Sequence, residues 1–106
     1  MTTFEGIPYK LVFFKKQECN PCKVTEEGLN TVLEQRPELR PIVHVLQKEY
    51  HSALVHSYEL QTYPTVLILD KNGDEVARRV GARLLPQEWW EKALTYIHDF
   101  RLRNNI

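Results

Sequence analysis

The sequence lacks several features that would each assign it to a class of proteins. No apolar run approaches the roughly 20 residues that a membrane-spanning helix needs. The 14 basic and 14 acidic side chains cancel, and no basic block occurs, which argues against nucleic acid or an anionic membrane as the main partner. The first residues have neither the charged start nor the apolar core of a signal peptide. If the chain is complete, we expect one cytoplasmic domain over residues 1–106, with no membrane segment.

Cysteine is also scarce, because the 106 residues contain only Cys19 and Cys22. A chain of this length can fold on its apolar core alone, so it needs no disulfide framework. In a reducing compartment, a lone Cys-x-x-Cys pair is more often catalytic or metal-binding than structural. Zinc prefers a complete tetrahedral ligand set, which two cysteines cannot supply. The histidines that would have to complete a site lack suitable spacing, so we expect no metal; they are His44, His51, His56 and His98.

The cysteine pair stands where an apolar run gives way to a helical pattern. A helix N-terminus has unpaired backbone N–H groups and a partial positive charge, which favour a thiolate. Pro21 suits the first helical turn, where its missing N–H costs nothing. We therefore expect Cys19 to be exposed and the more acidic thiol. Cys22 begins the apolar stripe that includes Leu29 and Leu33, so we expect it to face inward.

The pattern along the chain predicts four strands and three helices. We expect strands at about residues 9–14, 42–46, 65–69 and 75–80, with an Asn-Gly hairpin turn between the last two. We expect helices at about residues 20–35 and 49–60, and a third that begins at Pro86. In the third helix we expect Trp90 to be buried and Trp89 to lie at the edge of the core, and we expect the chain to fray from Arg101. This βαβαββα order predicts an α/β fold in which three helices flank a four-stranded mixed sheet. The cysteines follow the first strand, where sites commonly lie.

Three separated features of this sequence occur together: the cysteine pair after a strand, Tyr63-Pro64-Thr65 opening the third strand, and Lys71-Asn72-Gly73 followed by Val80-Gly81. In their joint spacing they resemble the thioredoxins. The resemblance covers about residue 10 to the last helix, and implies a minimal thioredoxin-like core without the leading strand and helix. It further implies a cis Pro64 beside a redox-active disulfide. Substrate-binding residues would be Asn20, Pro21, Tyr63, Pro64 and Gly81.

The resemblance also implies an activity, thiol-disulfide exchange that reduces protein disulfides. Cys19 would be the nucleophile that forms a mixed disulfide, and Cys22 would resolve it. No cofactor would be bound, because a thioredoxin reductase would supply electrons from NADPH. Ribonucleotide reductase is among the possible targets, and a monomer is the expected state.

Several positions depart from the thioredoxin pattern. The Trp before the first cysteine is Glu18, the buried Asp six residues before it is Phe13, and the Pro five residues after the second cysteine is Glu27, although Gly28 beside it would permit a similar bend. These departures leave open an interaction subunit whose groove binds a partner and whose thiols are secondary. A glutaredoxin-like reductant is another alternative, although the Gly-Gly-x-x-Asp pattern that holds glutathione is missing after the third strand.

Overall fold

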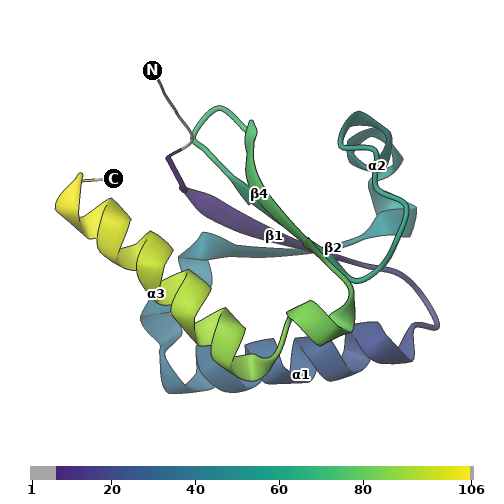
Figure 1. Ribbon diagram of the computed structural model, residues 1–106, viewed down its shortest axis with the longest axis horizontal. Helices are drawn as coiled ribbons and strands as arrows, with labels where there is room; N and C mark the ends of the chain where they lie inside the picture. Colours follow the sequence, from purple (N-terminus) through teal and green to yellow (C-terminus); the bar gives the residue numbers. More distant parts are fainter. Residues whose placement is uncertain (1–6, 106) are drawn as a thin grey trace.

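The computed structural model describes residues 7–105, which fold into a sheet with helices on both faces (Figure 1). Short 3₁₀ turns follow α1, β2 and β4 at Pro37–Ile42, Lys48–Tyr50 and Ala82–Leu84. The strands and helices in chain order are β1 (Lys10–Lys15), α1 (Asn20–Gln35), β2 (Val43–Gln47), α2 (Ser52–Ser57), β3 (Thr65–Leu69), β4 (Glu75–Val80) and α3 (Gln87–Arg103).

The sheet has the predicted mixed topology, with strand order β2-β1-β3-β4. β1 and β2 are parallel, because α1 carries the chain back across one face between them. β3 pairs antiparallel with both β1 and β4, and the β3–β4 connection is the predicted hairpin. β1 and β3 are thus the central strands, which explains why their sequences are almost continuously apolar.

Two apolar clusters cover the two faces of the sheet. Successive side chains of a strand point to opposite faces, so Leu11 and Phe13 pack with α1 and α3, whereas Val12 and Phe14 pack with Leu60 on the other face. Figure 1 shows α1 and α3 on one side of the sheet and α2 on the other. The burial of β1 on both faces fixes the position at which the chain leaves the sheet toward the cysteines.

The second helix differs from the prediction of residues 49–60. α2 has only six residues, and a separate 3₁₀ turn precedes it. Tyr50, the last residue of that 3₁₀ turn, is 74% exposed. The helix ends before Glu59, whose positive φ of 54° turns the chain so that Leu60 reaches the core. The buried contacts of Leu60 are therefore made by a turn rather than by a longer helix.

The last helix also differs at its end, because α3 continues to Arg103 instead of fraying from Arg101. Arg101 donates a hydrogen bond from Nη1 to the backbone oxygen of Tyr9 at 3.1 Å, and its guanidinium lies 4.5 Å from the centre of the Tyr9 ring. This contact with the chain before β1 anchors the last turns. Trp90 is fully buried and Trp89 partly buried, as predicted.

Candidate active site

Cys19 and Cys22 form a disulfide across the first turn of α1, with their Cα atoms 5.2 Å apart. Cys19 caps the helix, because its Sγ accepts a hydrogen bond from the backbone N–H of Cys22 at 3.2 Å. Cys22 is 1% exposed, which confirms its inward position. Cys19 is only 5% exposed, so the prediction of an exposed Cys19 is wrong. Its sulfur is turned onto the helix end, where the disulfide and this hydrogen bond hold it.

The register of the sheet gathers the other predicted site residues at the end where the cysteines lie. Phe14 in β1 is opposite Thr65 in β3, which is in turn opposite Val80 in β4. The chain leaves β1 at this end toward the cysteines, enters β3 from residues 63–64, and leaves β4 at Gly81. Segments far apart in the sequence therefore meet at one end of the sheet (Figure 1).

The Tyr63–Pro64 peptide bond is cis, as the resemblance implied. The backbone oxygen of Pro64 accepts a hydrogen bond from the N–H of Gly81 at 2.9 Å. Gly81 has φ 96° and ψ 145°, a conformation that side chains strongly disfavour. Pro64 is buried, whereas Asn20 and Pro21 are exposed. The structure thus joins Pro64 to Gly81 and leaves Asn20 and Pro21 accessible on the first turn of α1.

A cleft of about 480 Å³ opens beside the disulfide. It lies toward β2, because Gln47 at the end of β2 lines it, whereas Tyr63, Pro64 and Gly81 do not. Within it, Nζ of Lys15 donates to Oε1 of Glu26 at 2.9 Å. Besides the two cysteines and Gln47, its walls are formed by Lys15, Lys16, Gln17, Glu18, Lys23 and Glu26.

Comparison with known proteins was informative only at the level of structure. No family model and no curated protein sequence matches the chain. Among solved structures, a thioredoxin from Nicotiana alata is 26% identical with a TM-score of 0.64, the match covering 85% of this chain and 73% of that one. A thioredoxin from Malassezia sympodialis is 18% identical with a TM-score of 0.66, over 86% of this chain and 76% of the other. A thioredoxin-like protein from Clostridium perfringens is 24% identical with a TM-score of 0.66, and the match covers 90% of this chain and 74% of that one.

The protein has a thioredoxin fold. The fold and its disulfide-bonded Cys-x-x-Cys pair support a thiol-disulfide oxidoreductase at the level of the family.

Phe13 fills the position where the thioredoxin pattern has a buried Asp. Its side chain is fully buried and stands edge-on to Trp90, with ring centroids 5.5 Å apart and planes at 86°. This position of the thioredoxin fold is therefore apolar here. Two carboxylates instead share a cleft with both cysteines, Glu18 just before α1 and Glu26 on the helix itself.

Glu18 stands where the thioredoxin pattern has a Trp. It has a positive φ of 52° and is exposed immediately before Cys19. The preceding residue, Gln17, donates its backbone N–H to Oε2 of Glu49 at 3.4 Å. This hydrogen bond ties the cysteine loop to the 3₁₀ turn after β2.

Tyr63 is half-buried and packs against the cluster that contains Phe14 and Leu60. Nζ of Lys48 lies 5.4 Å from the centre of its ring, and its hydroxyl is buried with no hydrogen-bond partner among residues 7–105. Burial raises the pKa of Tyr63 above its usual value, and the negative charge of Glu49 raises it further.

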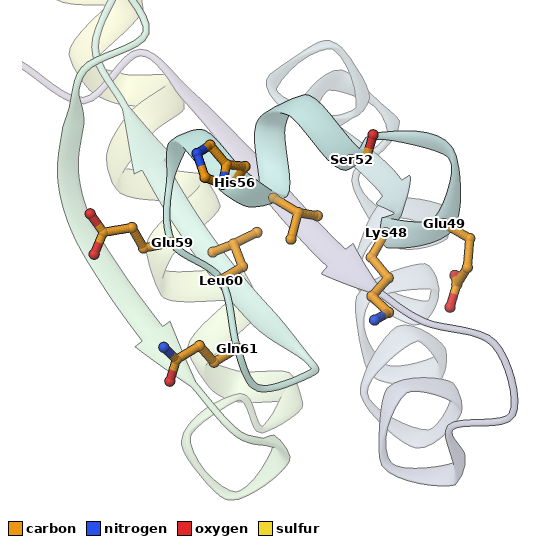
Figure 2. Close-up of a pocket in the computed structure, with 8 residues that line it drawn as sticks. Lys48, Glu49, Ser52, His56, Glu59, Leu60 and Gln61 are labelled. Atoms are coloured by element: carbon orange, nitrogen blue, oxygen red, sulfur yellow. The ribbon is translucent and has the colours of Figure 1, made fainter.

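A second, larger cleft of about 710 Å³ lies around α2 and contains none of the predicted site residues (Figure 2). Its walls are formed by Lys48, Glu49, Ser52, Val55, His56, Glu59, Leu60 and Gln61. It adjoins the end of the sheet where the cysteines lie through Glu49, which accepts the hydrogen bond from Gln17. The two cysteines line the cleft beside the disulfide and not this one.

None of the four histidines belongs to a cluster of metal-binding side chains in the part of the chain that the structure describes. Between residues 7 and 105, no three side chains of metal-binding type are grouped together. His44 lies on the edge strand β2. Partial burial holds its pKa below the usual value, and the positive charges of Lys10 and Arg101 lower it further.

No helix in the described part of the chain is long and apolar enough to cross a membrane.

Sequence reasoning missed the Lys15–Glu26 ion pair and the cleft that it lines. A signal was present, since Glu26 follows Cys22 by four residues and so lies on the same face of the helix. The place of Lys15 was harder to foresee, because it depends on how β1 ends beside α1 in three dimensions.

Proposed function

We propose that the protein is a thiol-disulfide oxidoreductase that reduces protein disulfides with Cys19 and Cys22. The observation that carries the proposal is their disulfide across the first turn of α1, at the end of the sheet where Pro64 enters β3. A disulfide in this place links two residues that local helix geometry already holds together. Closing or opening it therefore requires little rearrangement of the fold.

Cys19 is the nucleophile in this proposal. It caps α1, so its sulfur accepts the hydrogen bond from the backbone N–H of Cys22 and lies at the positive end of the helix dipole, both of which stabilise a thiolate. It also retains more exposure than Cys22, 5% against 1%. The Cys19 thiolate attacks one sulfur of a substrate disulfide, the substrate S–S bond breaks, and the other substrate sulfur leaves as a thiolate.

Cys22 completes the exchange. Its thiolate attacks the Sγ of Cys19 in the mixed disulfide, expels the remaining substrate sulfur and forms the Cys19–Cys22 bond of the structure. Two electrons have then passed from the protein to the substrate. A reductase that draws electrons from NADPH would restore the dithiol, in a compartment such as the cytoplasm where thiols are kept reduced.

The substrate contacts that we propose come from both sides of the disulfide. Asn20 and Pro21 are exposed on the turn between the cysteines. The backbone oxygen of Pro64 is already bonded to Gly81, so the main-chain groups of Tyr63 are the ones assigned to a substrate chain. We propose that the protein acts as a monomer.

The proposal is tested by separating the two sulfurs. With insulin as a general disulfide substrate and dithiothreitol as reductant, the wild type should accelerate reduction, and Cys19→Ser should abolish this activity. Cys22→Ser should accumulate a mixed disulfide with the substrate, detected by mass spectrometry, because the resolving thiol is missing. Equal trapping by both variants would contradict the assigned roles.

A partner-binding function gives a different result. If the thiols are secondary, the Cys19→Ala/Cys22→Ala variant retains its interactions, and neither serine variant changes the rate of disulfide reduction. That outcome would replace the redox proposal with the interaction subunit.

A further inference from the structure

Glu26 and Cys22 lie on the same face of α1 and line the same cleft. Residues four apart in a helix have Cβ atoms about 5–6 Å from each other, which a Glu side chain can span directly or through one water. Cys22 is 1% exposed, so bulk water has poor access to its sulfur. A thiol in this position reacts as a nucleophile only after a nearby group has taken its proton.

The other groups around the cleft are poorly suited to accept that proton. Lys15, Lys16 and Lys23 are cations without an acceptor atom, and β2 contributes the neutral Gln47. Phe13, from the central strand, is hydrocarbon.

Two carboxylates remain, and they differ in how they are held. Glu18 is exposed on the loop before Cys19. Glu26 is partly buried on α1 and anchored by the 2.9 Å hydrogen bond from Lys15 to its Oε1. A carboxylate has lone pairs on both oxygens, so this bond does not exhaust its capacity to accept a proton.

We propose that Glu26 accepts the proton of Cys22 during resolution of the mixed disulfide, with Lys15 as a positioning residue. This inference rests on the proposed function. As the Cys22 S–H bond breaks, its proton passes to the Glu26 carboxylate and its electron pair attacks Sγ of Cys19. The Cys19–substrate S–S bond breaks, the Cys19–Cys22 bond forms, and the departing substrate thiolate takes up a proton from Glu26 or from solvent.

Stopped-flow reaction of the reduced protein with excess 5,5′-dithiobis(2-nitrobenzoic acid) observes this step directly. Attack by Cys19 releases one coloured thiolate at a rate that depends on reagent concentration. Attack by Cys22 on the resulting mixed disulfide releases the second at a rate that does not. The rate of the second phase, measured from pH 6 to pH 9, therefore reports the reactivity of Cys22.

Glu26→Gln should slow the second phase by about 100-fold near neutral pH, at the low end of the range for general acid-base catalysis, and leave the first phase within about twofold. The deficit should shrink as pH rises, because hydroxide then removes the thiol proton without help. Glu26→Asp should recover part of the rate. Glu27→Gln removes the same charge from the next position of α1, outside this cleft, and should behave as wild type.

The sign of the effect separates a proton acceptor from a mere charge. If Glu26 acted only through its negative charge, its removal would stabilise the Cys22 thiolate and accelerate the second phase. An accelerated or unchanged second phase in Glu26→Gln, in protein that circular dichroism shows to be folded, overturns the inference. A wild type without any concentration-independent phase would instead overturn the proposed function, and this inference with it.

Discussion

Replacing Phe13 by Asp tests whether this core can accept the buried acid of the thioredoxin pattern. Phe13 is fully buried against Trp90, and truncating such an aromatic side chain costs about 3–5 kcal/mol of unfolding free energy. A buried carboxyl without a hydrogen-bond partner adds about 1–3 kcal/mol. The combined cost, about 4–8 kcal/mol, is comparable to the whole stability of a typical domain, about 5–15 kcal/mol. Phe13→Asp should therefore lose most of its unfolding free energy at neutral pH.

Urea unfolding followed by circular dichroism measures the effect, with Phe13→Ala as the matched control for lost packing. The difference between the two variants isolates the carboxyl. Burial raises the pKa of a carboxyl, so its charging favours the unfolded state as pH rises. The penalty relative to Phe13→Ala should thus be smallest below about pH 4 and grow toward neutral pH. A Phe13→Asp protein as stable as wild type at pH 7 would refute the claim that this position is obligatorily apolar.

Three further predictions concern backbone conformation and ionisation. Gly81→Ala should lower the unfolding free energy by about 1–3 kcal/mol in thermal melts, because φ is 96° although the space around a new Cβ is open; an unchanged midpoint would contradict this. Gly28→Ala should raise the unfolding free energy by about 0.5–1 kcal/mol, because the new Cβ would lie 3.5 Å from the Cβ of Gln87, an ordinary contact distance. A destabilised Gly28→Ala variant would mean that α1 and α3 pack too tightly for the added methyl group. Glu49→Gln should lower the raised pKa of Tyr63 in an ultraviolet titration, and an unmoved pKa would exclude the effect of the Glu49 charge. Because the pKa of Tyr63 is higher in the folded than in the unfolded chain, the wild-type fold should lose stability as pH rises from the usual tyrosine pKa toward the raised value.

The features that could be predicted from the sequence are those with local causes. The Asn-Gly turn, the apolar run of β3 and the pattern from Asn20 to Gln35 each determine their element within a few residues of chain. The cis Pro64 required more than local pattern, and came from the joint spacing of three motifs that resembles the thioredoxins.

The features that were missed depend on contacts distant in the sequence. The length of α2 could not be foreseen, because Leu60 is buried against β1 and β3 by a left-handed turn at Glu59 rather than by a helical stripe. The burial of Cys19 has a similar cause. A capping position suggests an accessible sulfur, but the disulfide and the N–H of Cys22 draw it onto the helix end.

The departures at Phe13, Lys15 and Glu26 become coherent when they are considered together. Phe13 gives the centre of the sheet a wholly apolar contact with α3, and so avoids the cost of a buried carboxylate. Two residues later the chain leaves the core, and Lys15 reaches across to Glu26 in the cleft that both cysteines line. An acid placed there remains partly hydrated and paired, so its charge costs little stability. In this protein the requirement for a stable core and the proposed requirement for a proton acceptor are thus met at separate positions.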